Sequence, residues 1–180
     1  MLIIPSNFVD FFSSPSTFLN MSSPPDSFTG DWITPEHSDY PKAIARWAAN
    51  AERRAKVVAY VKSAQDVVVV LRYAKQQNLP LTVRGGGHST AGASSIENGI
   101  VIDLSRHLTS VRVDPTAKLA YVCGGAIWES VDKAAIEHGL ATVAGTVNHV
   151  SNPDHHHDGA WFVTDTIPFL KTGVGGCVSS

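Results

Sequence analysis

The sequence predicts an α+β fold, because segments typical of strands and of helices are mixed along one short chain. Two amphipathic helical patterns alternate with short apolar runs, and three consecutive glycines directly follow one of those runs. The chain has 180 residues, of which 43% are hydrophobic. This is enough apolar material for one domain with its own core.

The N-terminal segment, 1–39, is predicted to be a poorly ordered tail. Up to about Asp31 it is rich in Ser, Pro and Phe, and it lacks the basic start and apolar core of a secretory signal. No secretory signal is thus recognised, and the expected location is cytoplasmic or else left unknown. Met21 stands just before S-S-P-P, and we hypothesise that it is the native start. The chain has no run of eighteen apolar residues, so no membrane span is expected.

The ordered domain is predicted to begin at Tyr40. A helix is indicated first, from apolar residues at helical spacing, namely Ala43, Ile44, Trp47 and Ala48. A strand follows at 56–61, and Ser63 with Asp66 forms an S-x-x-D start for a helix over 66–77. The next strand is 81–83. A right-handed crossover makes the two strands parallel.

Further strands and one more helix are predicted downstream. An apolar run at 100–104 is typical of a buried strand, and an Asp-Pro turn separates two further strands at 111–113 and 118–122. A second amphipathic helix spans 126–138, with Ile127, Val131, Ala134 and Ala135 facing inward, and Gly139 ends it. The segment 140–146 returns to extended chain.

The run R-G-G-G-H-S at 84–89 is the strongest functional signal in the chain. Glycine lacks a Cβ, so this turn can adopt positive φ and bring backbone N–H groups close to a ligand, which indicates an anion. His88 adds a nucleophilic imidazole that a purely structural turn does not need. The alternative to a cofactor-binding role is that His88 is a surface histidine at a tight turn.

The type of nucleotide can be narrowed by elimination. A G-x-G-x-x-G fingerprint needs its third glycine at Thr90, where no helical pattern begins, and no G-x-x-x-x-G-K-[ST] run exists. A diphosphate held by backbone amides beside a histidine remains, and flavin fits this description best among common cofactors. The net charge of −2 and the lack of a basic stripe argue against nucleic acid or an anionic membrane as partner.

Other polar residues give weaker signals. The run H-H-H-D at 155–158 could bind a metal, but a solvated loop is the better interpretation because no separated ligand set accompanies it. The two cysteines offer no disulfide framework and are compatible with a reducing compartment. Cys123 is predicted to be a core residue, and Trp128 to pack rather than stack on a flavin. Asp103 is expected to support a strand end or turn, with a cofactor contact as the minority alternative.

Four motifs together resemble a known family. They are R-G-G-G-H-S at 84–89, G-I-V-I-D-L-S at 99–105, G-G-A-I-W at 124–128 with V-D at 131–132, and H-G-L-A-T-V at 138–143. Over about 40–149 the chain resembles the FAD-linked oxidases, in particular the berberine bridge enzyme and 6-hydroxynicotine oxidase group. The resemblance implies a PCMH/VAO-type FAD-binding domain, of which the chain holds the N-terminal portion only.

The resemblance also implies roles for individual residues. His88 matches the histidine that carries the flavin covalently through its 8α-methyl carbon, and Val147 stands where some members have a second, cysteine link, which implies single attachment. The implied FAD-binding residues are Arg84, Gly85, Gly86, Gly87, His88, Ser89, Gly145, Thr146, Val147, Gly173, Val174 and Gly175. The implied reaction oxidises a small organic substrate by hydride transfer to FAD, which molecular oxygen then reoxidises. No catalytic base is assigned, because the family's base lies far downstream.

The C-terminal part departs from the family pattern. Relatives continue from G-T-V-N-H directly into a glycine-rich run, but here residues 150–171 separate 145–149 from T-G-V-G-G at 172–176. We hypothesise that 150–171 is a translated intron and that 172–180 is the truncated end of the flavin loop. The chain alone is then expected to be inactive and to leave sheet edges unpaired. The alternative function is a non-catalytic or vestigial nucleotide-binding domain.

Overall fold

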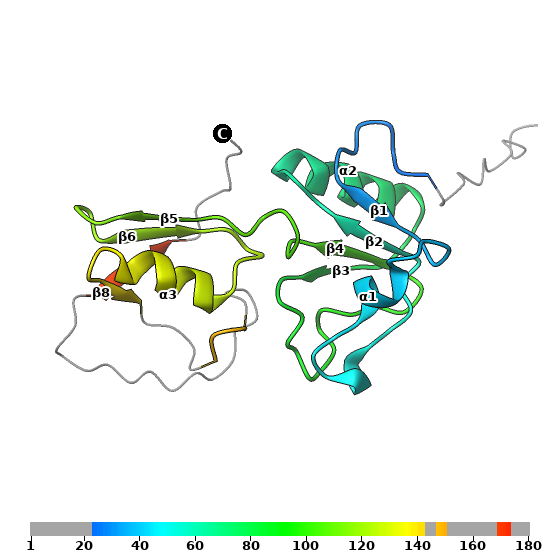
Figure 1. Ribbon diagram of the computed structural model, residues 1–180. Coiled ribbons are helices and arrows are strands. Elements are labelled where there is room, and N and C mark those ends of the chain that lie inside the picture. Colours follow the sequence, from blue (N-terminus) through cyan, green and yellow to red (C-terminus); the bar gives the residue numbers. More distant parts are fainter. Residues whose placement is uncertain (1–22, 143–146, 151–168, 174–180) are drawn as a thin grey trace, which may run out of the picture.

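The computed structural model describes residues 23–142, 147–150 and 169–173, the last range by its backbone only, and they form two neighbouring four-stranded sheets with three helices (Figure 1). The first sheet has the order β1-β2-β4-β3 and the second has the order β5-β6-β8-β7. The elements are β1 (Asp31–Ile33), α1 (Tyr40–Ile44), a 3-10 turn (Ala49–Ala51), β2 (Val57–Tyr60), α2 (Ala64–Gln76), β3 (Leu81–Arg84), β4 (Ile100–Asp103), β5 (Val111–Asp114), β6 (Leu119–Val122), α3 (Trp128–Ile136), β7 (Ala141–Thr142) and β8 (Phe169–Gly173).

The centre of the first sheet is a parallel trio of strands. Both β2 and β3 pair in parallel with β4, which lies between them, and β1 adds to β2 in the antiparallel direction. The predicted strand, helix, strand unit is therefore present with parallel strands, although they are not neighbours. β3 forms one edge, and its Leu81 and Val83 remain exposed. That a further region of the protein pairs with such edges stays a prediction.

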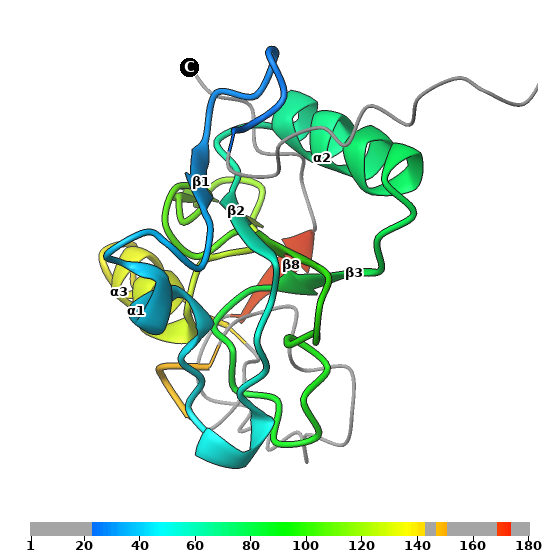
Figure 2. The ribbon, with the colours of Figure 1, turned by 90° about the vertical axis from the view of Figure 1, so that its right-hand side faces the viewer.

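The two faces of the first sheet each bear a core. Alternate residues of a strand point to opposite faces, so Val57, Ala59 and Val61 pack with α2, while Val58 and Tyr60 pack with α1. The β4 residues follow the same rule, with Ile100 and Ile102 on the α2 face and Val101 on the α1 face. The side view shows these two helices on opposite sides of the strands (Figure 2). This burial on both faces explains the unbroken apolar runs in the sequence.

The predicted cap of α2 is confirmed, although the helix begins at Ala64, two residues before the predicted position. Ser63 caps the helix, since its side chain accepts a hydrogen bond of 3.1 Å from the Asp66 backbone N–H. The Asp66 carboxylate in turn accepts hydrogen bonds from the backbone N–H of Lys62 (2.9 Å) and of Thr29 (2.8 Å). The helix start is thereby connected to the N-terminal segment.

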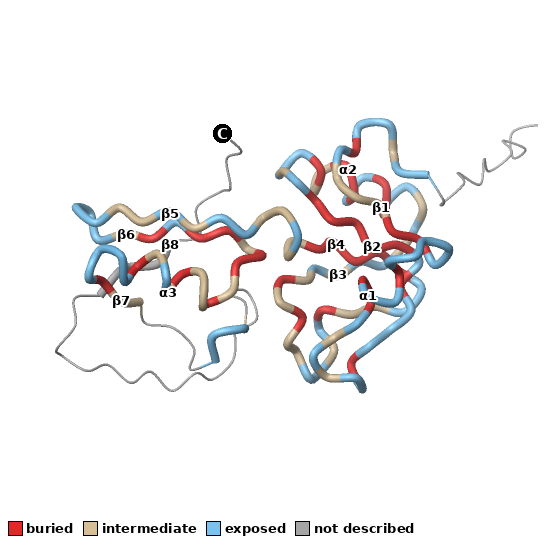
Figure 3. Tube along the Cα trace, in the orientation of Figure 1, coloured by how far each residue is buried: buried red, intermediate tan, exposed pale blue. Residues whose placement is uncertain are grey.

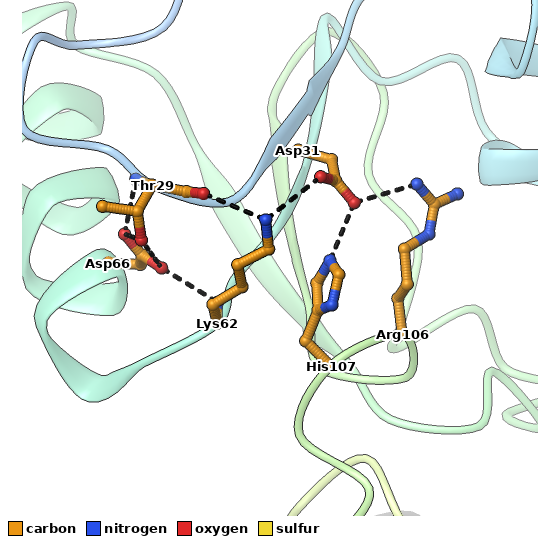
Figure 4. Close-up of polar contacts among 6 residues, drawn as sticks. All are labelled: Thr29, Asp31, Lys62, Asp66, Arg106 and His107. Carbon is orange, nitrogen blue, oxygen red and sulfur yellow. Dashed lines mark hydrogen bonds and ion pairs between the residues drawn. The ribbon is translucent and has the colours of Figure 1, made fainter. Parts of the chain in front are cut away.

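The segment 1–39, predicted to be a poorly ordered tail, contains ordered structure among its described residues. Residues 31–33 form β1, and Phe28 and Trp32 pack on the α2 side of the sheet. Asp31 of β1 also connects this segment to later parts of the chain (Figure 4). Its carboxylate lies 3.6 Å from Lys62 Nζ, 3.0 Å from Arg106 Nη1 and 2.8 Å from His107 Nε2. The strand was not predicted because the Ser- and Pro-rich composition of the segment favours disorder. Residues 1–22 lie outside the described part.

The first predicted helix is shorter than its apolar spacing indicates. It ends at Ile44, Ala45 is extended with ψ 142°, and Trp47 is 66% exposed rather than inward. The reason is the side chain of Arg46. Its guanidinium donates to the carbonyls of Ala43, Ile44 and Ala45, the acceptors that a continuing helix would use.

In the second sheet, the described side chains form a core on the face covered by α3. β5 and β6 form an antiparallel hairpin, and β8 lies between β6 and β7, parallel to both. Ala120 and Val122 of β6 pack against Val131 and Ala135 of α3. The helix begins at Trp128, two residues later than predicted, and ends at Ile136, before Gly139. Ile127 and Ala134 are half-buried rather than fully inward.

Candidate functional site

The glycine turn follows directly from β3 and is held tightly from behind. Gly87 has a φ of +77°, which favours glycine, and a Cβ at this position would lie 2.9 Å from Arg84 Nε. Its carbonyl accepts a hydrogen bond of 3.4 Å from the Trp47 backbone N–H. The turn therefore requires a glycine at its third position, as the sequence predicts.

A cavity of about 300 Å³ opens where the turn faces the second sheet's helix. The loop after β3 and the loop after β4 supply one side, and the segment that leads into α3 supplies the other. The lining residues are Gly86, His88, Ser105, Thr109, Gly125, Ile127, Ser130 and His149. The cavity thus joins the carboxyl ends of parallel strands to the N-terminal end of a helix, where ligands commonly bind.

His88 lies among aromatic rings at this cavity. Its ring centroid is 5.0 Å from that of His149 and 6.3 Å from that of Trp47, and both rings are tilted relative to it. The His88 side chain is half-buried. An imidazole in this position is accessible from the cavity and lies near two other aromatic rings.

Asp103 connects the glycine turn to the loop after β4. Its side chain is fully buried, and one carboxylate oxygen accepts from Arg84 Nη1 at 3.1 Å. The other oxygen accepts from the backbone N–H of Ser105 at 2.9 Å and from its Oγ at 2.6 Å. The expectation that Asp103 supports a strand end is confirmed, and through Ser105 that support extends to the cavity.

Close backbone packing sets the wall opposite the turn. A Cβ on Gly125 would lie 2.1 Å from the Leu104 carbonyl oxygen, and the Gly125 N–H donates to the Leu108 carbonyl at 2.8 Å. Only glycine allows the segment before α3 to approach the loop after β4 this closely. This contact places Gly125 beside Ser105 and Thr109 in the lining.

The first amides of α3 position His149. The Glu129 N–H donates to the Asn148 carbonyl at 2.7 Å, and the Trp128 N–H donates to the Val150 carbonyl at 3.1 Å. These are amides that a helix start leaves without an intrahelical partner. Residues 147–150 are thereby anchored to the helix, which brings the His149 ring opposite His88.

The predicted site residues fall into three groups. Gly86 and His88 line the cavity. The second group is described by the structure but does not line the cavity. It comprises Arg84, Gly85, Gly87, Ser89, Val147 and Gly173. The third group lies outside the described residues and comprises Gly145, Thr146, Val174 and Gly175. Within the second group, Ser89 Oγ accepts from the Ala93 N–H at 3.2 Å, and Gly173 pairs with Tyr121 in the sheet.

Six of the eight lining residues were not among the predicted site residues. Four of them lay within the quoted motifs or beside them, namely Ser105, Gly125, Ile127 and His149. Thr109 and Ser130 gave no sequence signal, because only the tertiary packing brings them to the cavity.

The remaining predictions concern packing, metals and membranes. Trp128 is 4% exposed and belongs to the core under the second sheet, which confirms packing. Cys123 is 5% exposed, as predicted for a core residue, and is not a free thiol.

Among the described residues, no three His, Cys, Asp or Glu side chains are grouped as a metal site requires, and 155–158 lie outside that part. In the same ranges no helix has the length and apolar character needed to cross a bilayer.

Comparison with known families agrees with this geometry. The profile of the FAD binding domain family matches residues 55–151, which is more than half of the chain. This chain belongs to the FAD binding domain family. The predicted family and fold class are confirmed, and the matched range contains every lining residue of the cavity.

Individual relatives are FAD-linked oxidoreductases. The chain is similar to (R)-6-hydroxynicotine oxidase of Paenarthrobacter nicotinovorans, with 35% identity over 67% of this chain and 26% of the relative. It is also similar to the uncharacterised FAD-linked oxidoreductase YgaK of Bacillus subtilis, with 33% identity over 68% of this chain and 27% of the relative. The crystal structure of 6-hydroxy-D-nicotine oxidase from Arthrobacter nicotinovorans superposes with a TM-score of 0.68 at 34% identity, covering 71% of this chain and 28% of that one. The chain thus spans about a quarter of the length of the relatives it matches.

Proposed function

We propose that this chain is the N-terminal portion of the flavin domain of an oxidase that carries FAD covalently on His88. The parent enzyme oxidises a small organic substrate by hydride transfer to the flavin, and molecular oxygen reoxidises it. The observation that carries the proposal is the position of His88, which lines the cavity beside Gly86 at the carboxyl end of a parallel strand. The family membership supports FAD as the cofactor.

The chemistry of the lining fits part of an FAD molecule. Hydroxyl groups of Thr109 and Ser130 and the backbone of two glycines suit phosphate oxygens, whereas the Ser105 hydroxyl already donates its proton to Asp103. Ile127 and the two imidazole rings suit a flat aromatic ring. The volume of about 300 Å³ is at the lower end of the range for sites of drug-sized ligands. We therefore infer that this portion of the domain encloses only part of the dinucleotide.

The roles proposed for the chain's own residues follow from their positions. The turn presents backbone amides to the diphosphate, His88 holds the flavin ring, and Asp103 fixes the turn and Ser105 relative to each other. Bound FAD supplies the acceptor for the hydride that the substrate gives up. We propose that the chain alone is inactive, because it spans about a quarter of its relatives and no catalytic base is assigned in it.

The domain division also remains a proposal. The flavin domain portion is assigned to 40–149, preceded by the strand β1, with 150–171 as an atypical insert and 172–180 as the truncated end of the flavin loop. The family match ends at residue 151, which supports a break in the pattern near that position.

Acid precipitation of the purified protein tests covalent attachment. We expect yellow colour to remain in the precipitate of the wild type and to be lost from that of His88→Ala. His138→Ala is the matched control, because His138 is an exposed histidine beyond the end of α3. Acid-stable colour in His88→Ala places the attachment elsewhere, and a folded wild type without any flavin contradicts the proposal. Hydrogen peroxide release by the complete parent protein tests oxygen as the acceptor.

A further inference from the structure

Two arginine side chains lie directly behind the glycine turn. Gly86 and His88 face the cavity, whereas Gly87 between them faces the other way. A Cβ on Gly87 would lie 2.9 Å from Arg84 Nε and 3.3 Å from Arg46 Cδ. The backbone of the turn is therefore the layer that separates the cavity from both arginines.

The charges in this cluster do not balance. Arg84 forms an ion pair with the buried Asp103. Arg46 donates five hydrogen bonds, all to backbone carbonyls, namely those of Ser94 (3.2 and 2.8 Å), Ala43 (3.2 Å), Ile44 (3.0 Å) and Ala45 (2.9 Å). Within the described part of the chain, no carboxylate lies within 4.0 Å of its guanidinium. Two cations thus share one contacting carboxylate, which leaves an excess of one positive charge.

This excess charge is energetically unfavourable in the protein by itself. Burial is the main cause that lowers the pKa of the Arg46 guanidinium, to about 10, and the neighbouring charge of Arg84 lowers it further. Arg46 nevertheless remains charged at neutral pH. Arg84 Nε is also buried, and no described residue accepts its hydrogen bond. An anion on the cavity side of the turn would relieve both the excess charge and the repulsion between the arginines.

We propose that the positive charges of Arg46 and Arg84, behind the glycine turn, make the turn favour the diphosphate group of the cofactor over the flavin ring. The inference rests on the proposed function, since it names how the same site selects its ligand. Arg46 acts through the turn as a positioning residue and does not line the cavity. Its positive charge is the property that matters, and Asp103 neutralises only one of the two guanidinium groups.

A purely structural role for Arg46 is the competing explanation. Its five hydrogen bonds tie 43–45 to Ser94, so any substitution weakens this connection. Arg46→Lys keeps the charge but loses the five-donor geometry, whereas Arg46→Gln loses both. If the role is structural, the two variants have equal effects on ligand preference. If it is electrostatic, only Arg46→Gln changes that preference.

The experiment compares FAD with riboflavin, which lacks the phosphates. Dissociation constants are measured by fluorescence titration on the 180-residue chain in a His88→Ala background, so that covalent attachment does not obscure affinity. We expect Arg46→Gln to reduce the preference for FAD over riboflavin about tenfold, and Arg46→Lys to retain most of it. Arg53→Gln removes the same charge from an exposed arginine and should leave the preference unchanged.

The outcomes separate this inference from the function on which it rests. Equal shifts for the Gln and Lys variants, an unchanged ratio in Arg46→Gln, or an equal shift for Arg53→Gln each overturn the role of Arg46. The same conclusion follows if the background protein binds FAD no more tightly than riboflavin. The proposed function is judged by acid-stable flavin on the wild type, which none of these ratios decides.

A pH titration keeps the test decisive if Arg46→Gln does not fold. A lysine side chain ordinarily has a pKa of about 10.4, and burial beside Arg84 lowers it, so the charge of Arg46→Lys can be removed within a measurable range. We expect its preference for FAD to fall between pH 7 and pH 9.5 while that of the Arg46 protein changes less. An identical pH dependence in both proteins contradicts the inference.

Discussion

The two sheets differ in how they are covered, and the difference assigns them different tasks. The first sheet has a helix and a core on each face, and the buried positions follow β2 and β4 along their whole length (Figure 3). Among the described residues, the second sheet has one core, beneath α3. On its other face Arg112 stacks 3.9 Å above the ring of Tyr121, which is 37% exposed. The first sheet is a two-sided scaffold, whereas the second is a one-sided layer.

The cavity combines these two regions. The scaffold supplies the turn with His88 and the loop with Ser105, at the carboxyl ends of the parallel strands β3 and β4. The one-sided layer supplies Gly125 and Ser130 at the start of its helix. We therefore expect substitutions in the core of the first sheet to destabilise the scaffold, and substitutions in the core of the second to destabilise the closing wall.

Loss of the buried Asp103 carboxylate, which joins the glycine turn to the loop after β4, is expected to lower the free energy of unfolding most. Asp103→Asn leaves Arg84, whose side chain is only 15% exposed, without its ion-pair partner. Removing one partner of a buried pair typically costs about 3–5 kcal/mol. Urea unfolding measures this loss, with Asp39→Asn as the control, because Asp39 is exposed and its side chain does not cap α1. Equal losses in the two variants would show that the Arg84 pair contributes no special stability.

A matched pair of valines tests the independence of the two cores. Val70 on α2 and Val131 on α3 are both fully buried, and truncation to alanine should cost about 2 kcal/mol at each. Hydrogen exchange should become faster in β2 and β4 with Val70→Ala, and in β5 and β6 with Val131→Ala. If either variant accelerates exchange equally in both sheets, the cores form one cooperative unit and the comparison fails.

The pH dependence of stability should report on the contact between the N-terminal segment and the first sheet. Burial by itself raises the pKa of Asp66, but hydrogen bonds from the Thr29 and Lys62 amides outweigh it and lower the pKa overall. The ionised carboxylate therefore stabilises the fold above its unfolded pKa of about 3.9, and this contribution is lost as the pH falls through the lower folded pKa.

Asp66→Asn should remove this dependence. We expect a loss of about 2 kcal/mol at pH 7 relative to the wild type, typical of hydrogen bonds to a charged group, and a smaller difference below pH 3. Unfolding by urea at both pH values provides the measurement. Asp26→Asn, at an exposed carboxylate on the same segment, should show no such change. A difference that stays constant with pH contradicts the assignment.

Local patterns predicted the parts of the fold that local interactions determine. The cap at Ser63, the apolar strands at 57–60 and 100–103 and the glycine turn were all visible in the sequence, because each depends on neighbouring residues. The position of β4 between β2 and β3 was not visible, since it depends on pairing between distant segments. The early end of α1 was missed for the same reason, as Arg46 also bonds to Ser94, which is far along the chain.

The candidate site shows the same division. His88 and Gly86 could be found because consecutive glycines beside a nucleophile are unusual in a purely structural turn. Thr109 and Ser130 could not, because their place in the lining depends on the close approach of Gly125 to the loop after β4. Glycine is required at 125 because of tertiary packing and not because of backbone conformation. The φ of Gly125 is not positive, and the residues that a Cβ would meet lie 17 to 21 positions away in the chain.

The cap of α2 should give the smallest effect and the sharpest test of local prediction. Ser63→Ala removes the acceptor for the Asp66 N–H, and loss of such a cap typically costs about 1 kcal/mol. Because α2 covers only one face of the first sheet, α1 and its core should retain their protection in hydrogen exchange. Ser38→Ala, at an exposed serine before α1, serves as the control. A cost for Ser63→Ala no larger than that of the control would mean that packing of Val70 and Tyr73, rather than the cap, determines where this helix begins.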